Sequence, residues 1–365
     1  MALALRLAAK GSTTTSPNPA VGAVVVAGGV VAGTGWHRRA GAAHAEVLAL
    51  QKAGEAARGA TLYVTLEPCS HHGRTPPCVD AVLAAGVTRV VVAMADPDPR
   101  VSGRGSAALA EAGVEVQVGV GRAEAETLNE AYLMHRREGR PFVTYKVALS
   151  ADGATAAVDR SSQWITGVVA RRDVHRLRAA SDAICVGVGT VLADNPTLTP
   201  RQPRATRAAR QPLRVVVDSR GRTPPEANVL DGQSPTLVAV TSQAPPAAVK
   251  DLIAAGAEVL EFPPDRGRVA LMPLLRSLAE RGVVSLLLEG GAHLAGSFAA
   301  QGLVDRYLVY VAPMFLGGDG LRAFEGWHIP TITDAPRLTF RSARRLGEDL
   351  RLELRANPQD PKGEG

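Results

Sequence analysis

The sequence predicts an α/β protein built from two domains. Its 365 residues exceed what one hydrophobic core usually serves, so two domains are expected. Short apolar runs of β type alternate with helical stretches along both halves of the chain, which is typical of layered α/β sheets. With 46% hydrophobic but only 4% aromatic residues, the composition supplies enough Ala, Val and Leu for cores of this class.

The first half of the chain alternates predicted helices and strands. A helix over 2–9 is ended by Gly11, and a Gly28-Gly29 turn between apolar runs predicts a β-hairpin. Helical composition over 43–53 places His44 and Glu46 in the first turn of a helix. The other predicted elements are strands at 21–26, 61–66, 89–93 and 114–120 and helices at 78–85, 106–112 and 124–137.

A break at Gly139-Arg140-Pro141 ends the last of these helices, and a new strand over 142–148 follows it. The expected domains are therefore residues 1–140 and 141–365. The Pro- and Arg-rich segment 200–212 is expected to be a surface loop and residues 357–365 a flexible tail. Further apolar strands are predicted at 183–186, 213–217, 236–240, 284–288 and 307–311.

Charge and cysteine content exclude several classes of protein. The formal charge of +6, from 41 basic and 35 acidic residues, is scattered without a run of five like charges. It therefore predicts a solvated surface and no nucleic-acid partner. The 3 cysteines favour a reducing compartment over a disulfide framework. No apolar run approaches the roughly 18 residues of a membrane span, so we expect a cytoplasmic protein with no membrane partner.

One stretch combines metal ligands with an acid. His44 and Glu46 are followed by Cys69, just past a predicted strand, and by Cys78 at the start of a predicted helix. One imidazole and two thiolates form a three-ligand set for Zn²⁺ with a fourth position left for water. A carboxylate two residues from the histidine is placed to move protons, so the stretch predicts hydrolytic chemistry.

Two interpretations without catalysis compete with this one. A fourth ligand from His71 or His72 would close a structural zinc site, and buried free cysteines could serve packing alone. Glu46 favours catalysis, because a structural site has no use for it. Asn18 lies between two prolines just before a predicted strand, where its amide would be held rigidly, although an ordinary turn residue is the plainer interpretation.

These segments resemble a known enzyme family. Zinc-dependent nucleobase deaminases carry His-x-Glu followed by Pro-Cys-x-x-Cys, whereas eight residues separate the two cysteines here. The longer spacing is typical of the bifunctional riboflavin-biosynthesis family, a pyrimidine deaminase fused to a reductase. The chain also resembles that family in Pro17-Asn18-Pro19 and in the whole run 65–78. The resemblance implies an N-terminal cytidine-deaminase-like three-layer α/β/α domain followed by a dihydrofolate-reductase-like α/β domain.

For the first domain, the resemblance implies zinc-dependent hydrolytic deamination of a diaminopyrimidinone ribosyl phosphate. By matching position, Glu46 would transfer protons and Zn²⁺ would be held by His44, Cys69 and Cys78. The residues that match the family's substrate contacts are Asn18, His71 and Arg74, with Arg74 a candidate for the ribose phosphate.

The second half carries a nucleotide motif of its own. An apolar strand over 286–288, Gly290-Gly291 and a predicted helix N-terminus form the geometry that accepts a pyrophosphate, although the pattern is not Gly-x-Gly-x-x-Gly. Segments 146–153, 162–166 and 189–199 resemble the family's reductase domain, which implies NADPH-dependent reduction of the ribosyl group to ribityl.

Matching positions imply two sets of contacts in this half. Those to NADPH are Ala148, Trp164, Thr190, Asp194, Ser219, Gly291, Ala292, His293, Leu294, Ala295, Gly296 and Ser297. Those to the substrate are Lys146, Ser162, Arg178, Leu198, Arg201 and Glu289, with Lys146 a candidate for polarising the sugar. The run Asp218-Ser219-Arg220 favours NADPH over NADH. Ala151 and Asn195 depart from the family, where Leu and Asp are usual.

Two other functions stay open. One is a nucleoside, nucleotide or RNA deaminase with a degenerate or unrelated nucleotide-binding second domain. The other is a structural zinc module joined to a nucleotide-binding sensor. On the favoured interpretation the partner is a small phosphorylated pyrimidine, and a homo-oligomer is expected.

Overall fold

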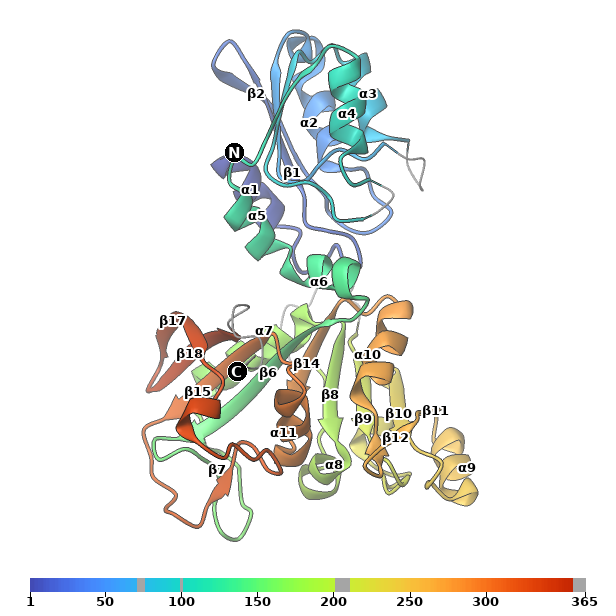
Figure 1. Cartoon of the computed structure of the whole chain (residues 1–365), viewed down its shortest axis with the longest axis vertical. Coiled ribbons are helices and arrows are strands. Elements are labelled where there is room, and N and C mark those ends of the chain that lie inside the picture. The colour runs from blue at the N-terminus through green and yellow to red at the C-terminus, as the bar shows by residue number, and fades with distance from the viewer. Residues whose placement is uncertain (71–75, 99–100, 201–210, 357–365) are drawn as a thin grey trace. The chain divides into compact units, whose positions relative to one another are not determined.

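The computed structural model describes residues 1–70, 76–98, 101–200 and 211–356 (Figure 1). The chain divides into two compact units, Met1–Arg140 and Pro141–Gly365, each with a sheet and core of its own. The expectations for most of the loop at 200–212 and for the tail at 357–365 lie outside the described residues.

The first unit contains a mixed five-stranded sheet. Its strands are β1 (Gly22–Ala27), β2 (Val30–Trp36), β3 (Thr61–Val64), β4 (Arg89–Val92) and β5 (Glu115–Val118). Their order is β2-β1-β3-β4-β5, with β1 antiparallel to both neighbours and the last three strands parallel. The predicted hairpin is confirmed: Gly28 and Gly29 adopt φ of 56° and 79°, which glycine reaches without strain.

Helices cover both faces of this sheet. They are α1 (Ala2–Ala9), α2 (Ala45–Ala53), η1 (Gly54–Ala57), α3 (Cys78–Ala84), α4 (Arg104–Glu111), α5 (Arg122–Leu128) and α6 (Glu130–Glu138). Val24 of β1 packs with α1, whereas its neighbours Ala23 and Val25 belong to the larger core shared with α2, α3 and α4. Alternate strand residues therefore serve opposite layers, and the predicted three-layer α/β/α arrangement is confirmed.

The helix predicted over 124–137 is interrupted at Asn129, where α5 ends and α6 begins. The buried Asn129 amide accepts a hydrogen bond from Ala20 N (2.8 Å) and donates one to Ala20 O (3.1 Å). Its backbone leaves the helical region, with φ −110° and ψ 18°. The break thus ties the helical segment to the residues that lead into β1.

Two glycines of β2 let α2 approach the sheet closely. A Cβ at Gly35 would lie 2.2 Å from Ala45 O, and one at Gly33 would lie 2.1 Å from Ala49 O. Small side chains at Ala45 and Ala49 complete this contact, and both residues are fully buried. The close packing fixes the first turn of α2, which His44 precedes and Glu46 occupies.

The second unit is built on a nine-stranded sheet. Its strands are β6 (Phe142–Ser150), β8 (Ala183–Gly187), β9 (Leu213–Val217), β10 (Thr236–Val240), β11 (Glu258–Glu261), β14 (Ser285–Glu289), β15 (Arg306–Ala312), β17 (Leu338–Leu346) and β18 (Asp349–Ala356). The order is β11-β10-β9-β8-β14-β6-β15-β18-β17, parallel from β11 to β15 and antiparallel at the last two strands. Strands predicted at 213–217 and 236–240 match β9 and β10.

Helices and short elements complete this unit. They are β7 (Ala154–Ala156), α7 (Val168–Ala180), α8 (Val188–Asp194), η2 (Asn228–Leu230), α9 (Pro246–Ala254), β12 (Pro264–Asp265), β13 (Arg268–Val269), α10 (Leu271–Glu280), α11 (Ala292–Ala300), β16 (Leu321–Arg322) and η3 (Ile332–Asp334). Separate apolar clusters lie on the two faces of the sheet, with Leu286 and Leu288 in one and Leu287 in the other. Across the described ranges, no helix is both long enough and apolar enough to span a membrane.

Candidate functional site

Three predicted metal ligands meet in the first unit. His44 is the N-cap of α2, Cys69 follows β3, and Cys78 opens α3. One Nδ1 atom and two Sγ atoms lie within 4.8 Å of one another, with His44 Nδ1 3.1 Å from Cys78 Sγ and 3.7 Å from Cys69 Sγ. A single tetrahedral ion fits such a group, and a nitrogen with two sulfurs is a donor set that suits Zn²⁺.

The two thiols differ in acidity. The hydrogen bond from Cys78 and the neighbouring His44 lower the pKa of Cys69 to about 4, against the opposing effect of burial. The pKa of Cys78 is raised, because its thiol donates to Cys69 and because it is buried. A divalent cation bound between them would favour the thiolate form of both.

Glu46 lies beside these ligands and is only 3% exposed. Burial raises the pKa of its carboxyl group, and the carboxyl shares a hydrogen bond with the Cys78 thiol. A carboxyl group whose protonated form is favoured by burial is in the environment typical of a general acid and base. The arrangement is thus suited to moving protons next to a metal.

His37 belongs to the same site, although the sequence did not single it out. Its ring lies edge-on to His44, with 5.4 Å between centroids. Its Nε2 is 3.2 Å from Asn18 Nδ2 and its Nδ1 is 3.3 Å from Ala43 O. Because an amide nitrogen only donates, Nε2 accepts and Nδ1 donates, which suits a neutral ring, and burial lowers the pKa of His37. Among the described residues, no side chain or backbone group bonds to the amide oxygen of Asn18.

The hairpin register explains how His37 reaches Asn18. His37 N donates to Val21 O (2.9 Å), so the end of β2 lies beside the residues that lead into β1. This edge of the sheet also carries the end of β3, where Cys69 follows. The sequence carried only part of this signal: the Gly28-Gly29 turn implies the hairpin, but a register shift between Val25 and Val26 moves the pairing by one residue, so the turn alone does not place His37 beside Val21.

Glu67 anchors the chain just before Cys69. Its buried carboxylate accepts three backbone N–H bonds, from Asp96 (3.2 Å), Gly103 (3.0 Å) and Ser106 (3.0 Å). Two of these donors lie at the N-terminal end of α4, where a negative charge is favoured. The chain is therefore fixed two residues before Cys69, one of the predicted metal ligands.

Replacing Glu67 by Gln is expected to weaken zinc binding about tenfold, because the amide group turns an NH₂ toward backbone donors and leaves at least one of them unpaired. Competition with a chromogenic chelator measures the affinity, and faster exchange of the Asp96, Gly103 and Ser106 amide hydrogens reports the loss of their bonds to the carboxylate. Glu115→Gln, on a side chain 67% exposed, is the matched control. Wild-type affinity together with wild-type exchange in the Glu67 variant would contradict this role.

In the second unit, three predicted substrate residues come together. Lys146 on β6 and Glu289 on β14 are paired across neighbouring parallel strands. Arg178 of α7 holds Glu289 with both arms of its guanidinium, Nε–Oε1 at 2.7 Å and Nη2–Oε2 at 2.8 Å. Burial lowers the pKa of the Lys146 ammonium group, and Glu289 opposes that effect. In this cluster, an amine with a lowered pKa lies beside a carboxylate whose position is fixed by Arg178.

The structure limits how Arg178 and Leu198, two of the predicted substrate contacts, could bind a substrate. The fork of Arg178 faces Glu289, so in this structure two of its three nitrogens are engaged by a carboxylate and not turned toward open space. Leu198 is 2% exposed, and its side chain lies in the apolar core. A contact from Leu198 to a substrate would therefore have to come from its backbone.

Several predicted cofactor residues gather where the parallel strands end. Gly290 and Gly291 adopt φ of 84° and 79° and lead from β14 into α11. A Cβ at Gly290 would lie 3.2 Å from the Thr190 hydroxyl, so α8 faces this turn closely. Asp194, at the end of α8, accepts a hydrogen bond from Ser162, which joins a predicted cofactor contact to a predicted substrate contact.

The remaining cofactor residues are spread around this edge. Ser219 follows β9 and its Oγ accepts a bond from Val269 N (3.1 Å), while Trp164 is 66% exposed and stacks on Arg171. Ala148 lies half-buried on β6. In the first turns of α11, Gly291, Ala292, His293 and Ser297 keep some exposure, whereas Leu294, Ala295 and Gly296 are buried and could offer only backbone groups.

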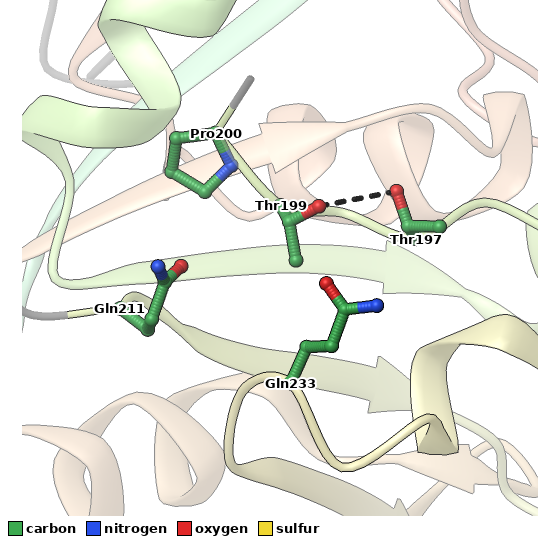
Figure 2. A pocket seen from close by; sticks show the side chains of 5 residues that line it. All are labelled: Thr197, Thr199, Pro200, Gln211 and Gln233. Atoms are coloured by element: carbon green, nitrogen blue, oxygen red, sulfur yellow. Dashed lines mark hydrogen bonds between the residues drawn. The ribbon is translucent and has the colours of Figure 1, made fainter. Parts of the chain in front are cut away.

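A pocket of about 310 Å³ lies beside the segment that contains Leu198. Figure 2 shows its five lining side chains, among them the Thr199 hydroxyl bonded to that of Thr197 at 3.3 Å. The lining is polar and uncharged, and its other members are Pro200, Gln211 and Gln233. The predicted residues His71, Arg74 and Arg201, like the alternative ligand His72, lie outside the described part of the chain.

Comparisons with known proteins cover both units. Residues 1–94 match the cytidine and deoxycytidylate deaminase zinc-binding region, and residues 141–352 match the RibD C-terminal domain. The riboflavin biosynthesis protein RibD of Escherichia coli K12 is 45% identical, covering 97% of this chain and 98% of that protein. The same-named protein of Chlamydia trachomatis is 49% identical, covering 88% of this chain and 85% of that one.

Solved structures give the same picture. Acinetobacter baumannii RibD has a TM-score of 0.88 at 39% identity, covering 98% of this chain and 97% of that one. A diaminohydroxyphosphoribosylaminopyrimidine deaminase/5-amino-6-(5-phosphoribosylamino)uracil reductase from Thermotoga maritima has a TM-score of 0.85 at 34% identity, with the same coverage. The similarity therefore extends over nearly the whole length of each chain.

Proposed function

The chain belongs to the RibD family of riboflavin biosynthesis proteins, and from that premise we propose that it acts twice on one phosphorylated ribosylaminopyrimidine. The first unit deaminates the diaminopyrimidinone ring by zinc-dependent hydrolysis, and the second reduces the ribosyl group to ribityl with NADPH. The observation that carries the proposal is the group of His44, Cys69 and Cys78 with the buried Glu46 beside it.

In the deaminase, Glu46 moves the protons. His44, Cys69 and Cys78 would hold a zinc ion, which would supply the Lewis acidity that makes water a competent nucleophile at neutral pH. Glu46 would accept a proton from the attacking water and deliver it to the departing ammonia, a double task that its raised pKa favours. Asn18, oriented by His37, presents its amide oxygen to the amino edge of the pyrimidine.

In the reductase, the cluster around Lys146 prepares the sugar. NADPH supplies the hydride. The Lys146 ammonium group polarises the ribosyl carbon–oxygen bond, and the paired Glu289 and Arg178 keep that ammonium in place. The backbone N–H groups at the start of α11, which follows Gly290 and Gly291 in the chain, could donate hydrogen bonds to the cofactor's pyrophosphate.

A two-step assay tests this function. Ammonia release is measured with the diaminopyrimidinone ribosyl phosphate alone, and NADPH oxidation is measured with and without the deaminated intermediate. We expect NADPH to be consumed only when that intermediate is present. A faster ammonia release from cytidine than from the ribosyl phosphate would favour a nucleoside deaminase with an unrelated second domain.

Partners and location follow from the same chemistry. The free thiols of Cys69, Cys78 and Cys185 suit a reducing compartment, so we propose a cytoplasmic enzyme whose partner is its phosphorylated small-molecule substrate. Neither nucleic acid nor a membrane is expected to bind it.

Self-association is a further part of the proposal. Strand β17 lies at the edge of the nine-stranded sheet, and Phe340 on it is 65% exposed. Leu350 on the neighbouring β18 is 47% exposed. Exposed apolar side chains along a sheet edge favour association with a second copy, and we propose a homo-oligomer. Sedimentation equilibrium measures its size.

A further inference from the structure

Residues 195–199 have an unusual backbone. Asn195 and Leu198 adopt φ of 40° and 51°, in the left-handed region that a bulky side chain rarely enters. Such conformations persist only where surrounding contacts fix them, and they gather at ligand sites. Leu198 is a predicted substrate contact, and Asn195 stands where the family usually has Asp.

Asn228, at the start of η2, holds Asn195 from two sides. The backbone N–H of Asn228 donates to Asn195 Oδ1 at 2.8 Å, and Asn228 Nδ2 donates to Asn195 O at 2.7 Å. Both the side chain and the main chain of the left-handed residue are thereby fixed. An aspartate at position 195 would offer the same accepting oxygen to the Asn228 N–H.

Arg214 fixes the next part of the segment. Its side chain is fully buried on β9, and its Nη1 donates to Thr197 O and to Asn228 O, each at 3.3 Å. The planar guanidinium of Arg214 therefore links the 195–199 segment to Asn228, which bonds to Asn195. Its other acceptors are Asp231 Oδ1, Ser234 O and Thr236 Oγ1.

The far end of the segment reaches the reductase cluster. Thr199 O accepts a long hydrogen bond of 3.5 Å from Arg178 Nη1, and the other two nitrogens of Arg178 hold Glu289. We propose that Arg214 and Asn228 are positioning residues, which hold 195–199 so that Thr199 O orients the Arg178–Glu289 pair toward the substrate. This inference rests on the proposed reductase function.

The test uses the full chain with zinc bound and the deaminated intermediate as substrate. Asn228→Ala removes one of the two bonds to Asn195 and is expected to raise KM for the intermediate about three- to tenfold, with kcat changed less than about twofold. The NADPH affinity and the rate of deamination are expected to stay at wild-type values. The exposed Gln301→Ala, at the end of α11, is the control.

A series at position 195 separates the contact from the backbone strain. Asn195→Asp keeps the accepting oxygen and is expected to keep KM within about twofold. Asn195→Gly accepts the positive φ freely but loses the oxygen, so its KM should match that of Asn228→Ala. If Asn195 served only to tolerate the positive φ, the Gly variant would have the lower KM and the Asp variant the higher one. That result would overturn the proposal.

Amide exchange over 195–200 gives a readout that is independent of turnover. The proposal expects faster exchange there in Asn228→Ala and Asn195→Gly, and wild-type exchange in Asn195→Asp. Unchanged exchange in the first two variants would show that Asn228 does not hold the 195–199 segment in place. That conclusion holds whether or not the chain reduces the intermediate. A wild-type chain that fails to oxidise NADPH with the intermediate overturns the proposed function instead.

Discussion

Replacing Glu46 by Gln is expected to leave zinc in place and to slow deamination by about 10⁴-fold. Glutamine has nearly the same shape, so the three ligands keep their positions, but it cannot take up and release a proton. The site of Glu46 is only 3% exposed, so bulk solvent is poorly placed to replace it. Metal content and ammonia release, measured on the same preparation, check both halves of the prediction.

The control for this variant lies in the same chain. With the deaminated intermediate supplied, Glu46→Gln should oxidise NADPH at the wild-type rate, because the substitution lies in the other unit. Glu55→Gln, an exposed residue just beyond α2, should retain both activities. Full deamination by Glu46→Gln would instead favour a structural zinc module, one of the alternatives that the sequence leaves open.

Local pattern predicted much of the first unit. Apolar alternation and the Gly28-Gly29 turn gave the hairpin, and β9 and β10 in the second unit match their predicted bounds. The grouping of His44, Cys69 and Cys78 was also predictable, because the predicted elements bring these three candidate ligands to the same place. Each of these features depends on residues close in sequence or on a motif with a definite chemical purpose.

Features that depend on distant contacts escaped prediction. The break at Asn129 could not be read from the local sequence, because its amide bonds to both backbone groups of Ala20, 109 residues away, as well as to Ala125 O one turn earlier. The resemblance named Arg178 and Glu289 as substrate contacts, but nothing in the local sequence shows that their side chains pair with each other across 111 residues. The hairpin of β17 and β18 was missed because exposure on both faces of β17 leaves no alternating pattern.

Replacing Lys146 by Met is expected to lower kcat/KM for the reduction by about 10²- to 10³-fold, while deamination continues at the wild-type rate. Methionine keeps the length and the apolar stem of the side chain but removes the charge that polarises the sugar. The rate of NADPH oxidation with the deaminated intermediate measures the effect. The NADPH affinity of the same variant, followed by fluorescence, shows whether the cofactor still binds.

The pH profile of the reductase should carry the signature of this amine. Burial lowers the pKa of Lys146, Glu289 opposes that effect, and Arg178 adds to it. Because the ammonium form is the active one, activity is lost as pH rises through this lowered pKa. The alkaline limb of kcat/KM should therefore lie below about 10.4, the value of an ordinary lysine.

Glu289→Gln provides the decisive shift in this profile. It removes the carboxylate that holds the pKa of Lys146 up and leaves Arg178 as an uncompensated positive charge nearby. The alkaline limb should then move to still lower pH, in addition to any loss of rate from the disturbed pair. A limb that stays in place in Glu289→Gln, or a Lys146→Met variant that reduces the intermediate normally, would mean that another group polarises the sugar.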